Sequence, residues 1–217
     1  MFYDRTEAGK KLALKLNKYQ KNKKVIVLAI PRGGVPVAFE VAKKLKVPLD
    51  LIIVRKLPMP DNPEAGIGAV SETGEIFWHP QAKLYPKEAI KKILSEQKEE
   101  IKRRIKVLRK GKGLAALKDK IVILIDDGLA MGSTMRAAIK TVKKEQAEKV
   151  VVAIPVAGKE ILKIIKDMAD EVVCLEVPLF FQAVAQVYEN WHDLSDQEVT
   201  EIMGKRQCLL SKENFLS

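Results

Sequence analysis

The chain has 217 residues, of which 47% are hydrophobic and 31% are charged, as expected for a globular protein with one substantial core. No apolar run approaches the roughly 20 residues that cross a bilayer, and the N-terminus carries acids where a signal peptide is apolar. We therefore expect a cytoplasmic protein rather than a membrane-spanning or secreted one. The formal net charge of +11 suits an anionic partner, either a phosphorylated small molecule or a nucleic acid.

The N-terminal part of the chain alternates between apolar runs and helical patterns. A helix is predicted over residues 5–18, and the fully apolar run at 25–30 predicts a core strand. A proline and two glycines within 31–34 break this run, and residues 35–45 then show helical apolar spacing. Residues 51–54 predict a second strand. Strand, turn and helix in this order are typical of a parallel sheet with helices on both faces.

Basic residues follow each of these two predicted strands, and two glycines accompany the first of them. Arg32, Gly33 and Gly34 form a turn in which glycine lets the backbone approach a ligand and arginine can grip an anion. The alternative is an ordinary strand-to-helix turn that needs glycine for its backbone conformation. Arg55 and Lys56 come after the second strand, so their charges are expected to face the same crevice.

A long excursion, residues 55–120, separates the second and third predicted core strands. Residues 57–69, near the start of this excursion, contain prolines and glycines, and loops this long usually have a function. Glu64 is the only glutamate in that loop and is either an acid–base group or a solvated surface residue. Residues 71–74 predict a hairpin turn, and residues 86–109 predict a helix with one apolar face.

The run at 121–134 is the most specific feature of the sequence. Its first five residues are apolar and mostly β-branched, which is typical of a central parallel strand. Asp126 and Asp127 follow at the carboxyl end, where ligands bind in open α/β sheets. The turn after them opens a helix whose free N–H groups attract a phosphate. The alternative is a buried strand that simply ends in an Asp-Asp-Gly turn.

This run resembles the phosphoribosyl diphosphate signature of type I phosphoribosyltransferases, in which apolar residues, two acids and a small-residue turn follow in that order. The resemblance implies that Asp126 and Asp127 contact the ribose 2′- and 3′-hydroxyls, and reach a metal ion through those hydroxyls or through water. It also implies that the turn binds the 5′-phosphate through Gly128, Leu129, Ala130, Met131, Gly132, Ser133 and Thr134. Met131 departs from the family, which usually has a threonine there.

The same resemblance assigns roles to other parts of the chain. It implies that Arg32, Gly33 and Gly34 bind pyrophosphate. It also implies that residues 57–69 form a flexible loop that closes over the substrate, with the catalytic side chains Arg55 and Lys56 before this loop and Glu64 within it. In the aromatic-rich segment 178–191, Phe181 corresponds to a phenylalanine that covers the base in purine enzymes of the family. The alternative is that these aromatic side chains only fill the core.

The sequence therefore predicts one α/β domain over residues 1–217, a type I phosphoribosyltransferase-like parallel sheet flanked by helices. Residues 55–120 would form a small hood with the flexible loop, and residues 178–217 a C-terminal aromatic segment. The implied reaction moves a 5-phosphoribosyl group from phosphoribosyl diphosphate to a nitrogenous base or related nucleophile, releases pyrophosphate and uses Mg²⁺. The acceptor is left open, and a homodimer would match the common state of the family.

Two other functions remain open from the sequence. One is a non-catalytic sensor of phosphoribosyl diphosphate that binds nucleic acid, and the other is a hydrolase of a related phosphorylated sugar. The segment 102–112 is dense in lysine and arginine, but it lacks interleaved aromatic residues. We expect it to be a solvated helix face, with neither a nucleic acid nor a membrane as partner.

Overall fold

A five-stranded parallel sheet, in the order β2-β1-β6-β7-β8, forms the body of the protein. The computed structural model describes residues 1–62 and 65–214, with side chains up to Lys205. The strands of the sheet are β1 (Val25–Ala29), β2 (Leu49–Leu51), β6 (Ile121–Ile125), β7 (Lys149–Val156) and β8 (Glu171–Glu176). Because β1 lies between β2 and β6 and is buried on both faces, its apolar run is continuous. The predicted parallel sheet is confirmed.

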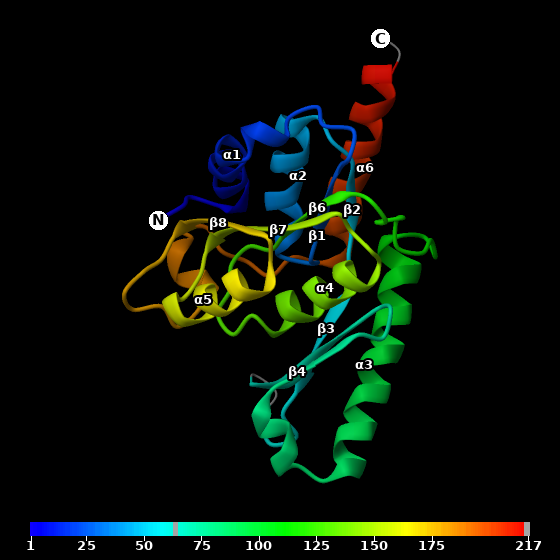
Figure 1. Cartoon of the computed structure of the whole chain (residues 1–217), viewed down its shortest axis with the longest axis vertical. Coiled ribbons are helices and arrows are strands. Elements are labelled where there is room, and N and C mark those ends of the chain that lie inside the picture. Colours follow the sequence, from blue (N-terminus) through cyan, green and yellow to red (C-terminus); the bar gives the residue numbers. More distant parts are fainter. Residues whose placement is uncertain (63–64, 215–217) are drawn as a thin grey trace.

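Helices cover both faces of this sheet (Figure 1). The described helices are α1 (Arg5–Lys15), α2 (Gly34–Leu45), α3 (Lys87–Leu108), α4 (Ser133–Lys144), α5 (Lys159–Met168) and α6 (Asp196–Asn214). Val27 of β1 packs with residues of α1 and α2, whereas its neighbour Leu28 packs with residues of α4 and α5. This alternation follows from the two-residue period of a strand. In the described part of the chain, none of the helices has the length and apolarity needed to cross a membrane.

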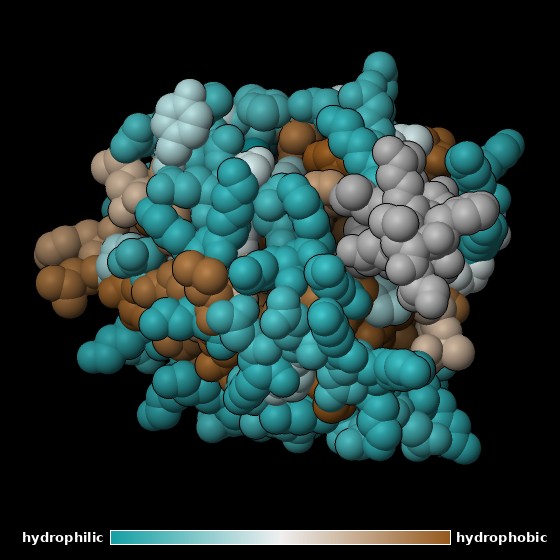
Figure 2. Space-filling model, turned by 90° about the horizontal axis from the view of Figure 1, so that it is seen from above, coloured by the Kyte–Doolittle hydropathy of each residue, from teal (hydrophilic) through white to brown (hydrophobic). Residues whose placement is uncertain are grey.

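The face over α1 and α2 is covered largely by hydrophilic side chains (Figure 2). Much of the lysine and glutamate in the chain therefore lies on solvated helix surfaces, as in the exposed pair of Lys11 and Glu7. Such pairs contribute little to stability.

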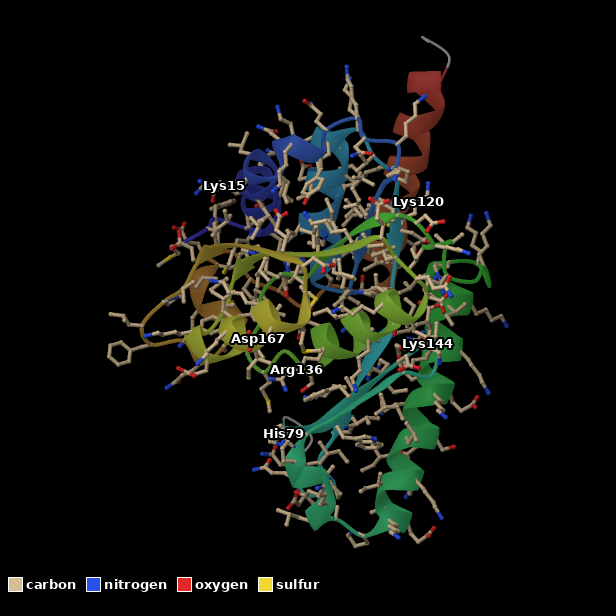
Figure 3. All side chains as sticks on the ribbon, in the orientation of Figure 1. Lys15, His79, Lys120, Arg136, Lys144 and Asp167 are labelled. Carbon is tan, nitrogen blue, oxygen red and sulfur yellow. The ribbon has the colours of Figure 1, made fainter. Side chains whose placement is uncertain are left out.

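A three-stranded antiparallel sheet and α3 form a hood that projects from the body (Figure 1). Its strands are β3 (Val54–Pro58), β4 (Gly66–Ser71) and β5 (Ile76–Trp78), followed by the 3-10 helix η2 (Pro80–Leu84). One side of α4 contacts the hood. The guanidinium carbon of Arg136 lies 4.5 Å from the centre of the Phe77 ring, and Lys140 Nζ donates a hydrogen bond to the Ile76 carbonyl. Lys144, on the same side of α4, pairs with Glu75 of the hood. Figure 3 shows Arg136 and Lys144 on the side of α4 that faces the hood.

The sequence prediction was wrong for the segment that joins the body to the hood. Residues 51–54 are not one strand, because Leu51 ends β2 and Val54 begins β3 in the other sheet. The whole segment 51–54 is buried, so the hydrophobic pattern does not show where β2 ends and β3 begins. The predicted flexible loop 57–69 is strand at both of its ends, because residues 57–58 belong to β3 and residues 66–69 to β4, and Pro58 pairs with Gly66. Glu64 lies outside the described residues.

The edge strand β8 is held in place by Glu171, its first residue. Glu171 Oε2 accepts hydrogen bonds from Tyr19 Oη at 2.7 Å and from Lys149 Nζ at 2.8 Å. Lys18 Nζ lies 2.8 Å from Oε1. Burial acts to raise the pKa of Glu171, but the hydrogen bonds outweigh it and lower the pKa from 4.5 to about 2. Tyr19 ends the short 3-10 helix η1 (Asn17–Tyr19), so this network ties β8 to the segment before β1.

A depressed pKa makes this stabilisation dependent on pH. The Glu171 carboxylate contributes fully above its unfolded pKa of 4.5 and loses its contribution as the pH falls through about 2. We expect Glu171→Gln to lower the free energy of unfolding at neutral pH, with the difference from wild type shrinking over this window in denaturant titrations. Glu148→Gln, which removes the exposed partner of Lys24, should have a smaller effect. A Glu171→Gln difference that stays constant with pH would contradict the assignment.

Candidate functional site

The candidate site lies where β1 and β6 end. These strands are neighbours and pair in register, with Ala29 opposite Ile125, so the turns that follow them meet. A β-carbon on Gly33 would lie 2.0 Å from Asp127 Oδ2, and one on Gly34 would lie 2.9 Å from Asp126 Cα. Glycine is therefore required at both positions because the backbone of one turn touches the acids of the other. The structure brings together the two motifs that the sequence placed about a hundred residues apart.

The two acids differ in their surroundings. Asp126 is half-buried, whereas Asp127 is 8% exposed. The Asp127 N–H donates a hydrogen bond of 2.9 Å to Asp126 Oδ1. Burial and the neighbouring Asp127 charge raise the pKa of Asp126 well above its ordinary value. A strongly perturbed carboxyl group at the end of a parallel strand is typical of a functional site.

The turn between Asp127 and α4 is shaped by close backbone packing. Leu129 N donates to the Val156 carbonyl, and a β-carbon on Gly128 would lie 2.7 Å from the Val156 side chain. Gly132 has a φ of +67°, and a β-carbon there would lie 2.6 Å from Ile161. No side chain caps the first turn of α4. Its N–H groups are therefore suited to an anion.

The predicted phosphate-binding residues are not equally accessible. Ser133 is 7% exposed and Leu129 is 2% exposed, so the Leu129 side chain belongs to the core and can offer only its backbone. Thr134 is half-buried, and Ala130 is exposed. Met131 is 48% exposed and brings a thioether, which is a weak acceptor, to a position where the related family usually has a hydroxyl.

The predicted basic residues come from two places, the turn after β1 for Arg32 and strand β3 of the hood for Arg55 and Lys56. Arg32 Nη1 lies 3.9 Å from Asp196 Oδ1 at the start of α6. Arg55 Nε donates to Gln97 Oε1 at 3.0 Å, and burial together with the charges of Arg104, Arg32 and other arginines lowers the pKa of Arg55. Arg55 is thus near Arg32, although it lies within β3 rather than in a loop. Lys56 alternates to the opposite face of β3, so the two residues do not form a side-by-side pair.

Phe181 lies next to the turn that is predicted to bind phosphate. Its Cδ1 would be 3.5 Å from a β-carbon on Gly158, and it lines a cavity of about 410 Å³ together with Ala130 and Leu179. The sequence therefore located an aromatic side chain at the edge of the site. Because Phe181 is half-buried, part of its ring is open to a ligand.

Sequence reasoning missed one buried residue of this site. Arg5, near the N-terminus, forms an ion pair with Asp127 in which Nε lies 2.8 Å from Oδ2. Nothing in the local pattern distinguishes this arginine from the other basic residues of α1. Only the folded chain brings together two residues that are 122 positions apart.

Most of the basic segment 102–112 is offset by carboxylates. Arg104 is 7% exposed and bonds Glu100, which also accepts two hydrogen bonds from Arg103. Arg109 is equally buried and pairs with Glu72 in the hood. The pairs of Arg103 and Arg104 with Glu100 lie within α3, whereas Arg109 connects the end of α3 to the hood. The four lysines of the segment are exposed to solvent.

The sheet, the hood and the paired turns define a phosphoribosyltransferase fold. The phosphoribosyl transferase domain family matches residues 3–190, and the chain therefore belongs to this family. Two Mycobacterium tuberculosis proteins named "putative phosphoribosyl transferase", from strains CDC 1551 and H37Rv, are each 39% identical to it over 208 residues. The match covers 94% of this chain and 47% of each relative, so the chain spans about half the length of these curated relatives.

A solved structure also resembles the chain over nearly its full length. The crystal structure of TT1426 from Thermus thermophilus aligns with a TM-score of 0.77 and 39% sequence identity. The alignment covers 93% of this chain and 97% of that one. The overall fold of the chain is thus similar to that of an experimentally determined structure.

Proposed function

We propose that the protein transfers the 5-phosphoribosyl group of phosphoribosyl diphosphate to a nitrogen nucleophile and releases pyrophosphate. The observation that carries this proposal is the contact between the Gly33 turn and Asp127, next to the uncapped N-terminus of α4. A diphosphate, two ribose hydroxyls and a 5′-phosphate need three such binding elements side by side. Membership of the phosphoribosyltransferase family supports the same general reaction.

Each element has a role that follows from its chemistry. The half-buried Asp126 accepts hydrogen bonds from ribose hydroxyls, and the backbone of the 128–134 turn, with Ser133 and Thr134, binds the 5′-phosphate. Arg32 and Arg55 offset the charge of the diphosphate as its bond to the anomeric carbon breaks. A carboxylate near the ring stabilises the cationic centre that forms there. The nucleophile then bonds to this carbon and loses its proton to solvent.

Mg²⁺ suits the residues of this site. The described residues contain no cluster of three or more histidine, cysteine or acidic side chains that could hold a metal by themselves. Mg²⁺ is commonly bound by one or two carboxylates, water and substrate phosphates, so Asp126 and Asp127 fit an ion that binds together with the diphosphate. The ion would supply positive charge to the leaving group.

The acceptor is proposed to bind beside Phe181. A half-buried aromatic ring next to a cavity of about 410 Å³ suits a planar nitrogenous ring, which stacks on an aromatic face. This position also lies beside Ala130 of the phosphate-binding turn.

The proposal is tested by pyrophosphate release from phosphoribosyl diphosphate and Mg²⁺ with a panel of purines, pyrimidines and amines. Release that depends on one class of acceptor, with formation of the matching nucleotide, is expected. Equal release without an acceptor would identify a hydrolase instead. Tight binding of phosphoribosyl diphosphate without release under any condition would favour a regulatory protein.

A further inference from the structure

Arg5 is a buried arginine whose contacts lead to the acidic turn. It is the first residue of α1 and is 6% exposed. Its Nε donates to Asp127 Oδ2 at 2.8 Å, and its Nη1 donates to the His192 carbonyl at 2.9 Å. The guanidinium carbon lies 3.8 Å from the centre of the Trp191 ring. The two acceptors, Asp127 and the His192 carbonyl, and the Trp191 ring over one face hold the guanidinium in one orientation.

The segments that carry these groups are fastened to each other. Phe2 N donates to the Val187 carbonyl, and the Phe2 carbonyl accepts from Glu189 N. Tyr188, between these two positions, donates its hydroxyl to the main-chain carbonyl of Asp127 at 2.7 Å. Burial raises the pKa of Tyr188, so this hydroxyl stays protonated and remains a donor. The N-terminal segment and residues 187–192 thus form a frame around Asp127.

This frame favours one carboxylate oxygen of Asp127 for a ligand. Oδ2 is bonded to Arg5 and is covered by the backbone of Gly33. Oδ1 is farther from that backbone, since it would lie 3.0 Å from a β-carbon on Gly33, compared with 2.0 Å for Oδ2. The orientation of the carboxylate therefore depends on Arg5, because rotation about its last bond would break the ion pair.

The charge of Arg5 also matters for an anionic substrate. Two adjacent carboxylates repel each other and would repel a diphosphate at the neighbouring turn. A permanently charged guanidinium in contact with Asp127 offsets the negative charge of that acid. Lysine would retain the charge, but it could not bond Asp127 and the His192 carbonyl as a planar fork while stacking on Trp191.

We infer that Arg5 is a positioning residue that orients Asp127 for the ribose hydroxyls, an inference that rests on the proposed function. Arg5 contacts the acid and not the substrate. Replacing Arg5 with lysine, which keeps the charge but not the planar fork, therefore weakens ligands that carry the ribose hydroxyls and leaves inorganic pyrophosphate, which binds at the 32–34 turn, unaffected.

The test compares two ligands by calorimetry, ribose 5-phosphate and inorganic pyrophosphate, each with Mg²⁺. For Arg5→Lys, the dissociation constant of ribose 5-phosphate should rise about tenfold, as for one lost hydrogen bond, while that of pyrophosphate stays within about twofold. Arg5→Met should raise the dissociation constant of ribose 5-phosphate further. Arg109→Met is the matched control, because it removes an equally buried arginine whose partners are Glu72 and the Leu51 carbonyl instead of Asp127.

The two ligands separate positioning from general stability. If Arg5→Lys weakens both ligands equally, or neither, the positioning role is overturned while the proposed function stands. The same conclusion follows if Arg109→Met shows the same selective loss. A wild-type protein that binds neither ligand would overturn the proposed function, and the role of Arg5 with it.

Discussion

Asp126→Asn lowers kcat/KM for phosphoribosyl diphosphate by about 100-fold or more, if the site acts as proposed. The substitution keeps the size of the side chain and an oxygen that can accept the Asp127 N–H. It removes the negative charge that stabilises the cationic ribose centre and the stronger acceptor for a ribose hydroxyl. Steady-state assays of pyrophosphate release, with the acceptor found from the panel, measure this effect.

The control for this substitution is Asp167→Asn. Asp167 lies on the exposed surface of α5 (Figure 3), so its loss changes the net charge by the same amount without touching the site. We expect Asp167→Asn to keep kcat/KM within about twofold, since exposed charges at a distance are largely screened. If Asp126→Asn were as active as Asp167→Asn, the role assigned to the acidic pair at the ribose would be wrong.

Gly33→Ala is expected to destabilise the protein by about 3 kcal/mol and to abolish activity. The added methyl group would lie 2.0 Å from Asp127 Oδ2, the oxygen that Arg5 bonds. Either the carboxylate leaves Arg5, and a buried ion pair breaks, or the 31–34 turn moves away from β6. Denaturant unfolding gives the stability, and pyrophosphate release gives the activity.

Gly113→Ala is the matched control for this glycine. A β-carbon on Gly113 meets nothing within 4 Å, and its backbone φ is not in the left-handed region. Its substitution should therefore leave the free energy of unfolding unchanged or raise it slightly, because alanine lowers the conformational entropy of the unfolded chain. If Gly33→Ala behaved in the same way, the contact between the two turns would not exist in solution.

The parallel strands could be predicted because burial on both faces gives continuous apolar runs. Residues 25–30 and 121–125 have no polar interruption, and each is followed by a turn that begins a helix. Strand β8 could not be found in the same way, because this edge strand is only half-buried and begins and ends with glutamate. The passage from β2 to β3 is buried throughout, so hydrophobicity does not mark where one sheet ends.

The site could be predicted where its residues are neighbours in sequence. Asp126, Asp127 and the turn after them form one run at the end of β6. The glycine turn at 32–34 follows β1, the strand that pairs with β6. Arg5 and the pairing of Arg103 with Asp196 depend on contacts between distant segments, which leave no local signal. The alternation of Arg55 and Lys56 depends on β3 being a strand, whereas the sequence suggested a loop.

The central claim is that the paired turns bind phosphoribosyl diphosphate through the acids and the phosphate-binding backbone. Calorimetric titration of the wild-type protein and of Asp126→Asn with this ligand and Mg²⁺ tests it most directly. We predict binding by the wild type with a dissociation constant between about 1 µM and 1 mM, the usual range for enzyme substrates, and at least about tenfold weaker binding by Asp126→Asn. No wild-type binding at millimolar ligand, or equal binding by both proteins, would contradict it.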